Sequence, residues 1–157
     1  MEKSFFCASE EQTKILGMTL GSFLKERDVV CLNGVLGAGK TTFAKAIAQG
    51  MEIAADEVTS PTFTIMNVYE SKKTLQHFDL YRIDKLEELA DIGFAEYIDN
   101  KAVSLIEWAN LFPQVLPLSK LIIEINILAN GREFVFLPQG ERFEQIMQEV
   151  ACAYTGN

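Results

Sequence analysis

The chain has 157 residues, of which 48% are apolar and 23% are charged, the usual mix for one packed globular domain. Its net charge of −8 argues against a protein that grips nucleic acid by itself, because phosphate neutralisation requires a basic face. The sequence has no basic leader and no apolar run near the about 18 residues of a membrane span, and its three cysteines are far apart. We therefore expect a cytoplasmic protein with buried free thiols and no membrane partner.

The first quarter of the chain predicts a strand, a helix, a second strand and a second helix. Residues 4–8 form a short apolar run that is typical of an edge strand. Ser9 and Gln12 have the spacing of a capping box ahead of apolar residues at helical intervals, which predicts a helix over about 10–25. Residues 28–34 are apolar and β-branched, as in a buried strand, and residues 40–51 carry one apolar helical face.

The turn between that second strand and that second helix carries the strongest motif. It has the spacing Gly-x-x-x-x-Gly-Lys-Thr of a phosphate-binding loop and reads Gly34-Val35-Leu36-Gly37-Ala38-Gly39-Lys40-Thr41-Thr42. Glycines let consecutive N–H groups turn toward phosphate oxygens at a helix N-terminus. Lys40 adds a positive charge for the β- and γ-phosphates, and the Thr41 hydroxyl is placed to ligate Mg²⁺. The motif predicts a site for a nucleoside triphosphate with Mg²⁺.

The rest of the chain predicts two hairpins around a buried strand. Residues 61–69 and 74–81 alternate between apolar and polar and flank a polar turn, and two short helices follow near 85–90 and 95–97. Residues 102–106 are a compact apolar run that ends at Glu107, as in a buried parallel strand. Strands at 120–128 and 133–137 flank an Asn-Gly turn, and a helix covers 141–152.

Together these elements predict one α/β domain over residues 1–157 with the fold of a P-loop NTPase. We expect a central sheet that is mainly parallel around the loop strand, with antiparallel additions from the hairpins and helices on both faces.

Two carboxylates are candidates for the acidic group that faces the loop, holds Mg²⁺ and orients the attacking water. Ligands of such sheets bind beyond the carboxyl ends of the strands, where Glu107 stands. Asp79 also ends a strand, but the alternation of that strand is less typical of the centre of a sheet. We favour Glu107 for the main acidic role and keep Asp79 as the second candidate. The alternative for either is a solvated carboxylate at a strand end.

Other residues near these motifs allow both a functional and a purely structural interpretation. His77, the only histidine, is either a core or surface residue or a functional neighbour of Asp79. Trp108 either fills core, which is the favoured interpretation, or stacks on a base or partner. The hydroxyl-rich loop before the third strand either senses the γ-phosphate as a switch or caps that strand, and it contains Ser60, Thr62 and Thr64.

The sequence favours ATP over GTP and disfavours a kinase. The nearest match to the guanine-recognition motif Asn-Lys-x-Asp is residues 100–103, which lack the aspartate. A kinase with a second phosphorylated substrate usually clamps it with several arginines. The arginines of this chain are widely scattered, at Arg27, Arg82, Arg132 and Arg142, and Arg82 is the one near the motifs.

Four motifs in register resemble the TsaE family, small bacterial ATPases formerly called YjeE. They are Gly37–Thr42, Ser60-Pro61-Thr62-Phe63-Thr64, His77-Phe78-Asp79-Leu80-Tyr81-Arg82 and Glu107-Trp108. The resemblance implies a protein needed to form N6-threonylcarbamoyladenosine in tRNAs that read codons beginning with A. It implies binding and slow, partner-dependent hydrolysis of ATP, in action on a heterodimer of TsaB and TsaD. We expect tRNA to be contacted indirectly and the free protein to be a monomer.

The resemblance also implies roles for individual residues. Lys40, Glu107 and Asp79 are the expected catalytic residues. ATP or ADP is expected to contact Gly37, Ala38, Gly39, Lys40, Thr41 and Thr42 through its phosphates, and Ser9 and Arg132 near its base. Mg²⁺ is expected at Thr41, Thr42 and Glu107. Candidate switch or partner residues are Ser60, Thr62, Thr64, His77, Tyr81, Arg82 and Trp108. A small-metabolite phosphotransferase and a nucleotide-sensing adaptor without turnover remain the alternatives.

Overall fold

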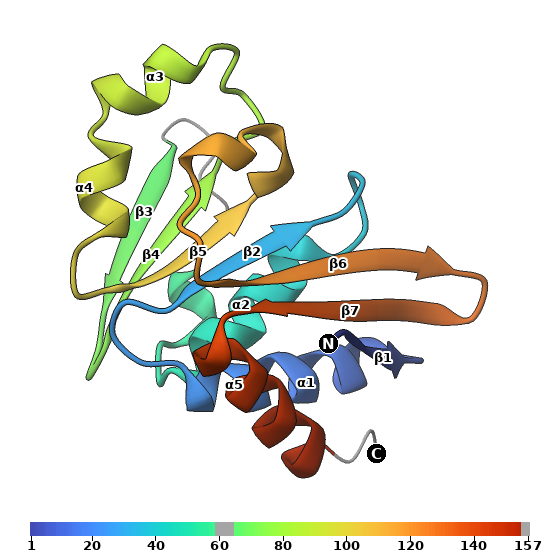
Figure 1. Cartoon of the computed structure of the whole chain (residues 1–157). Coiled ribbons are helices and arrows are strands. Elements are labelled where there is room, and N and C mark those ends of the chain that lie inside the picture. The colour runs from blue at the N-terminus through green and yellow to red at the C-terminus, as the bar shows by residue number, and fades with distance from the viewer. Residues whose placement is uncertain (59–64, 155–157) are drawn as a thin grey trace.

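The computed structural model describes residues 1–58 and 65–154, which contain a seven-stranded sheet of order β1-β7-β6-β2-β5-β4-β3 (Figure 1). The strands are Lys3–Cys7 (β1), Val29–Asn33 (β2), Met66–Glu70 (β3), Thr74–Asp79 (β4), Val103–Glu107 (β5), Lys120–Leu128 (β6) and Gly131–Gln139 (β7). The four central strands β6, β2, β5 and β4 run parallel, and the outer pairs are antiparallel. The predicted α/β fold with a parallel centre is confirmed.

Helices cover both faces of the sheet, as predicted (Figure 1). One face carries Glu10–Phe23 (α1), Lys40–Gly50 (α2) and Glu141–Ala153 (α5), and the other carries Leu86–Asp91 (α3) and Phe94–Ile98 (α4). Single 3₁₀ turns lie at Ala55–Glu57 (η1), Ala109–Leu111 (η2) and Pro113–Val115 (η3). In the described part of the chain, every helix is too short or too polar to span a bilayer.

The central strands are buried on both faces because their side chains alternate between two apolar cores. In β2, Val30 and Leu32 pack beneath α1 and α2, whereas Cys31 packs into the core beneath α3 and α4. In β5, Leu105 points to the α2 side and Ile106 to the α4 side. Since side chains alternate along a strand, this pattern decides which face each later residue of β5 occupies.

The start of α1 and its close contact with α2 position the phosphate-binding loop. The Ser9 hydroxyl accepts the Gln12 N–H at 3.2 Å, and the Gln12 amide oxygen accepts the N–H of Ala8 at 2.7 Å, one residue earlier than the predicted capping box. At Gly21 a Cβ would lie 2.1 Å from the carbonyl oxygen of Ile47 in α2. The absence of a side chain at Gly21 therefore allows α1 to lie directly against the helix that follows the loop.

Strand β4 corrects one prediction, because it is an interior strand and not a peripheral one. It lies between β5 and β3 and pairs in parallel with β5, with Asp79 opposite Glu107. Its sequence alternates because its polar residues are buried with partners. Gln76, for example, donates to the carbonyl of Tyr97 at 2.9 Å and to the hydroxyl of Ser104 at 3.0 Å. Alternation here reflects buried hydrogen bonds and not a solvent-facing side.

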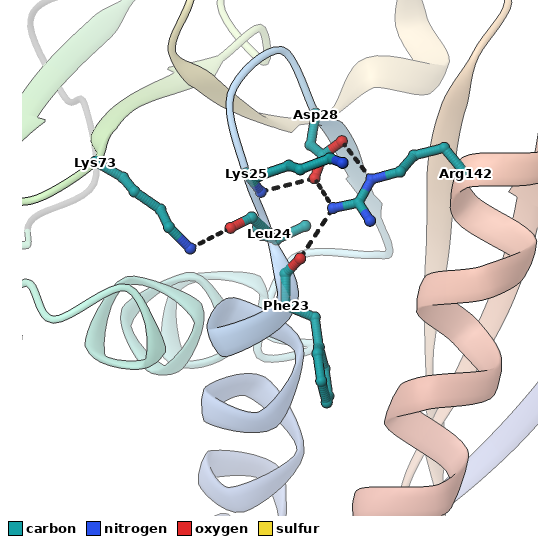
Figure 2. Close-up of polar contacts among 6 residues, drawn as sticks. All are labelled: Phe23, Leu24, Lys25, Asp28, Lys73 and Arg142. Carbon is teal, nitrogen blue, oxygen red and sulfur yellow. Dashed lines mark hydrogen bonds and ion pairs between the residues drawn. The ribbon is translucent and has the colours of Figure 1, made fainter.

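A polar cluster at the start of β2 joins α1, β2 and α5 (Figure 2). The Arg142 guanidinium donates to Asp28 through Nε at 3.1 Å and through Nη2 at 2.7 Å, and Nη2 also donates to the Phe23 carbonyl at 2.9 Å. The same carboxylate accepts the backbone N–H of Lys25 at 2.8 Å. This partly buried ion pair lies at the opposite end of β2 from the phosphate-binding loop.

The cysteines depart from the prediction at one position. Cys7 and Cys31 are buried free thiols, as predicted, whereas Cys152 is exposed. Burial raises the pKa of Cys31 to about 12 and also raises the pKa of Cys7. Cys152 differs because it lies on α5, whose buried positions are Phe143, Ile146, Met147 and Val150.

Candidate functional site

The loop from Gly34 to Gly39 connects the carboxyl end of β2 to the N-terminus of α2. Gly37 and Gly39 have φ angles of 81° and 106°, which a residue with a Cβ rarely adopts. Gly39 is the N-cap of α2 and contributes no side-chain hydrogen bond to the helix. The first N–H groups of α2 are therefore not capped by that residue, as suits a helix end that binds an anion.

Lys40 opens α2 and is 6% exposed. Its Nζ donates to the carbonyl oxygens of Gly34 at 2.5 Å and Val35 at 2.9 Å, and it lies 4.1 Å from the centre of the Trp108 ring. Burial lowers the pKa of Lys40, while the charges of Glu107 and Asp79 act to raise it. The ammonium group is thus held by the loop's own carbonyls and a ring, and the charges of two carboxylates act on it.

Glu107 and Asp79 lie side by side at the carboxyl ends of β5 and β4. Glu107 falls on the α2 side of the sheet because it follows Leu105 by two residues, and it is only 2% exposed. Asp79 is its partner in the strand register, and the carboxylate of Asp79 accepts the N–H of Tyr81 at 3.0 Å. Burial raises the pKa of Asp79 against the effect of that hydrogen bond, and Glu107 raises it further. Neither group is the fully solvated strand-end carboxylate of the alternative interpretation.

His77 is completely buried and contacts the main candidate carboxylate. Its Nε2 atom lies 2.5 Å from Oε2 of Glu107. The two residues come from neighbouring strands, in which His77 is opposite Leu105. The structure therefore brings His77 into the candidate site, where the sequence had left its place open.

Trp108 does not simply fill core, which was the favoured interpretation. The residue is half-buried against the α4-side core, and its ring packs on Tyr81 at 4.8 Å between centroids as well as over Lys40. Its backbone has a φ of 61°, and its N–H donates to the carbonyl of Leu32 at 3.1 Å. The turn after β5 thus carries the ring back over the loop. Tyr81 and the residue that follows it, Arg82, are exposed.

A cavity of about 270 Å³ lies beside the loop, between β1, α1 and β7. Arg132 donates from Nε to the carbonyl oxygen of Ala38 at 3.1 Å and so joins β7 to the loop. The cavity brings together Ser9 and Arg132, the two residues expected near a base, with the phosphate-loop residues. Its lining includes Cys7, Ser9, Thr13, Gly39, Thr42 and Arg132.

A second cavity of about 470 Å³ lies on the other flank of the loop, where Asn33, Gly34 and Trp108 contribute to its wall. The Asn33 side chain accepts the backbone N–H of Asn110 at 3.2 Å, which joins the loop strand to the turn after Trp108. Sequence reasoning passed over Asn33. The pattern that could have indicated Asn33 is a polar residue at the end of an otherwise apolar strand.

The predicted residues Ser60, Thr62 and Thr64 lie outside the described residues, so their role stays a prediction. Within the described ranges, no three histidine, cysteine or acidic side chains form a metal site by themselves. The oxygen donors near Lys40 are instead Asp79 and Glu107, with the hydroxyl of Thr41 one residue along α2. Mg²⁺ commonly binds one or two carboxylates together with substrate phosphates, and this set of donors fits that chemistry.

The family model "Threonylcarbamoyl adenosine biosynthesis protein TsaE" matches residues 7–134, a span that includes the loop, both carboxylates and Arg132. The chain belongs to the TsaE family. The tRNA threonylcarbamoyladenosine biosynthesis protein TsaE of Bacillus subtilis strain 168 is 40% identical over 143 residues, which are 90% of this chain and 89% of the relative. The TsaE of Treponema pallidum strain Nichols is 42% identical over 123 residues, 78% of this chain and 90% of the relative.

A solved structure shares the fold of this chain. The crystal structure of YdiB from Bacillus subtilis matches with a TM-score of 0.79 and 33% identity, and the match covers 97% of this chain and 95% of that one. The resemblance seen in the four sequence motifs is therefore confirmed. TsaE membership supports a role in the formation of threonylcarbamoyladenosine in tRNA, on a fold of the P-loop ATPase type.

Proposed function

We propose that this TsaE protein binds ATP with Mg²⁺ and hydrolyses it slowly, with residues 1–157 as one ATPase domain. The observation that carries the proposal is the meeting of Lys40, Glu107 and Asp79 at the carboxyl ends of three adjacent parallel strands. There, a lysine at the start of a helix lies close enough to two carboxylates for their charges to raise its pKa. That combination suits a triphosphate with a divalent cation.

In this proposal the nucleotide lies along the N-terminus of α2. The N–H groups of Gly37 to Thr42 bind the phosphates, and Lys40 exchanges the carbonyls of Gly34 and Val35 for phosphate oxygens. The base occupies the cavity beside Ser9 and Arg132. ATP is the proposed nucleotide because the sequence lacks the aspartate that pairs with guanine.

The metal-side ligands in the proposal are Thr41 and the two carboxylates. Thr42 lines the base-side cavity, which makes Thr41 the better placed hydroxyl of the pair. Mg²⁺, when bound, neutralises charge on the phosphate oxygens. Glu107 is the principal acidic residue because it is buried and its charge acts on Lys40 more strongly than that of Asp79, which supports it from the adjacent strand.

The residues of the chain have distinct parts in hydrolysis. Glu107 accepts a hydrogen bond from the attacking water and orients it toward the γ-phosphate, while Lys40 and the loop N–H groups stabilise the developing negative charge. Arg27 donates to the carbonyl of Asp99 and Arg142 pairs with Asp28, both away from the loop, whereas Arg132 contacts the loop at Ala38 on the side of the base cavity. We therefore propose slow turnover alone and faster turnover with a partner.

We propose that the partner is the TsaB–TsaD heterodimer and that tRNA is contacted indirectly, in the cytoplasm. The net charge of −8 favours a protein partner over direct contact with RNA. The loop also presents apolar side chains to solvent, since Val35 is 63% and Leu36 is 66% exposed. A partner that approaches the γ-phosphate side would meet these two residues.

The test measures phosphate release from ATP and GTP with Mg²⁺ or with a chelator, alone and with TsaB and TsaD, with and without tRNA. We expect slow Mg²⁺-dependent release from ATP that rises with the two partners, and little release from GTP. Lys40→Ala should lose nucleotide binding and release. Binding of ATP with no release under any condition would indicate the adaptor, and transfer to a small acceptor would indicate the phosphotransferase.

A further inference from the structure

We propose that His77 is a positioning residue, whose Nε2–H holds one carboxylate oxygen of Glu107 and thereby orients the other. The proposal rests on the proposed ATPase function for its kinetic consequence. The contact between His77 and Glu107 needs no nucleotide, so it is measured separately from ATP hydrolysis.

The geometry keeps both side chains almost entirely out of bulk solvent. His77 is 0% exposed and Glu107 is 2% exposed, and their side chains meet at 2.5 Å between Nε2 and Oε2. A buried carboxylate without a hydrogen bond is costly, so the imidazole stabilises Glu107 in its buried position. Since Oε2 is engaged, Oε1 is the oxygen that this pair leaves for a cation or a water molecule.

The environment of the ring decides which nitrogen carries the proton. Among the described residues, Nδ1 of His77 is buried with no hydrogen-bond partner. A proton on Nδ1 would be a buried donor without an acceptor, and the lone pair of Nε2 would then face the Glu107 oxygen. A proton on Nε2 instead has a carboxylate as its acceptor. Nε2 is therefore the ring nitrogen on which this site holds a proton toward Glu107.

His77 affects catalysis by orienting Glu107 and not by contact with the nucleotide. His77 is two residues from the strand end at which Asp79 lies, and within the described part of the chain its hydrogen-bond contact with the site is the one to Glu107. Residues that hold a ligating or catalytic group in place typically change activity by about 10- to 100-fold when removed. We expect His77 to act on turnover more than on nucleotide affinity.

The first test is nuclear magnetic resonance of the full chain labelled with ¹⁵N. His77 is the only histidine, so long-range proton–nitrogen correlations give a single imidazole pattern. We expect the pattern of the Nε2–H tautomer in the wild type and its loss in Glu107→Ala. An Nδ1–H pattern in the wild type, or an unchanged pattern in Glu107→Ala, would overturn the proposal.

The second test compares variants in ATP turnover and in the affinity for a fluorescent ATP analogue. His77→Leu should lower turnover by about 10- to 100-fold and change the dissociation constant by less than about 3-fold. His77→Gln should restore part of the turnover because its amide N–H can donate to Glu107. In a Glu107→Gln background, His77→Leu should have little further effect.

Gln76→Leu is the matched control, since it removes the buried hydrogen bonds of the preceding residue in β4 without touching Glu107. We expect its turnover to stay near that of the wild type. Equal losses in Gln76→Leu and His77→Leu, or additive losses with Glu107→Gln, would contradict the positioning role. If the wild type hydrolyses no ATP even with its partners, the ATPase proposal fails, and the tautomer measurement still decides the His77–Glu107 contact.

Discussion

Lys40 and Trp108 are in direct contact, with the ammonium nitrogen 4.1 Å from the centre of the indole ring. The contact places the only tryptophan of the chain on the lysine that the phosphate-binding loop presents. A cation over an aromatic face is attracted by the electron-rich face of the ring. The state of the lysine is therefore coupled to the surroundings of a natural fluorophore.

The first prediction is that ATP changes the tryptophan fluorescence, because phosphate oxygens draw Lys40 away from the ring and from the carbonyls of Gly34 and Val35. Lys40→Met should alter the emission of the free protein and remove the response to ATP. Titration of both proteins with ATP and Mg²⁺ measures this. An identical response in the variant would show that the ring does not report on Lys40.

The second prediction concerns the stability cost of Asp79. Burial raises the pKa of Asp79 in the folded state above its ordinary value of 3.8, so the folded state binds this proton more tightly than the unfolded state. Stability contributed by this group is present at low pH and is lost as the pH rises through the folded pKa. Asp79→Asn should therefore raise the Tm of the nucleotide-free protein at pH 7 by about 1 to 3 °C. The gain should disappear near pH 3.5; a gain that persists there would rule out titration as its cause.

The third prediction compares how much two ion pairs, one partly buried and one exposed, stabilise the protein. Arg142→Met leaves the buried Asp28 carboxylate without its bidentate partner and should lower the free energy of unfolding by about 2 to 4 kcal/mol. Lys72→Met removes an exposed pair with Glu52 and should cost less than about 0.5 kcal/mol. Urea unfolding measures both. Equal losses in the free energy of unfolding would show that the Arg142–Asp28 cluster in Figure 2 stabilises the protein no more than an exposed ion pair does.

The fourth prediction concerns the thiols. Because burial raises the pKa of Cys31 to about 12 and also raises that of Cys7, neither forms much thiolate at pH 8, whereas Cys152 is exposed. A thiol-reactive dye should modify one cysteine rapidly in the native protein and three in denaturant. Cys152→Ser should remove the rapid reaction. Rapid reaction of that variant would show that a buried thiol becomes accessible.

The sequence predicted the local parts of the site well. The loop and the strand before it are contiguous, and Glu107 could be recognised because a short apolar run ends there. Spacing alone also placed Ser9 at the N-cap of α1, where the structure has it. These features depend on neighbours along the chain, so pattern and chemistry were sufficient.

The long-range contacts could not be predicted in the same way. The contact of His77 with Glu107 depends on the parallel register of β4 and β5, and the ion pair of Arg142 with Asp28 joins residues 114 positions apart. Strand β4 looked peripheral because buried hydrogen bonds of Gln76 imitate the alternation of a half-exposed strand. Position in the sheet, and not residue type, decided these cases.

The measurement that tests the central claim most directly is single-turnover hydrolysis of ATP by the wild type and Glu107→Gln, with the bound ATP measured in each. Glutamine keeps the size of the side chain and an oxygen that accepts from His77 but removes the charge. We predict that both proteins bind ATP with Mg²⁺ within about 3-fold of each other and that hydrolysis falls by about 100-fold or more in the variant. Equal hydrolysis by the two proteins would contradict the assignment of this site as the centre of an ATPase.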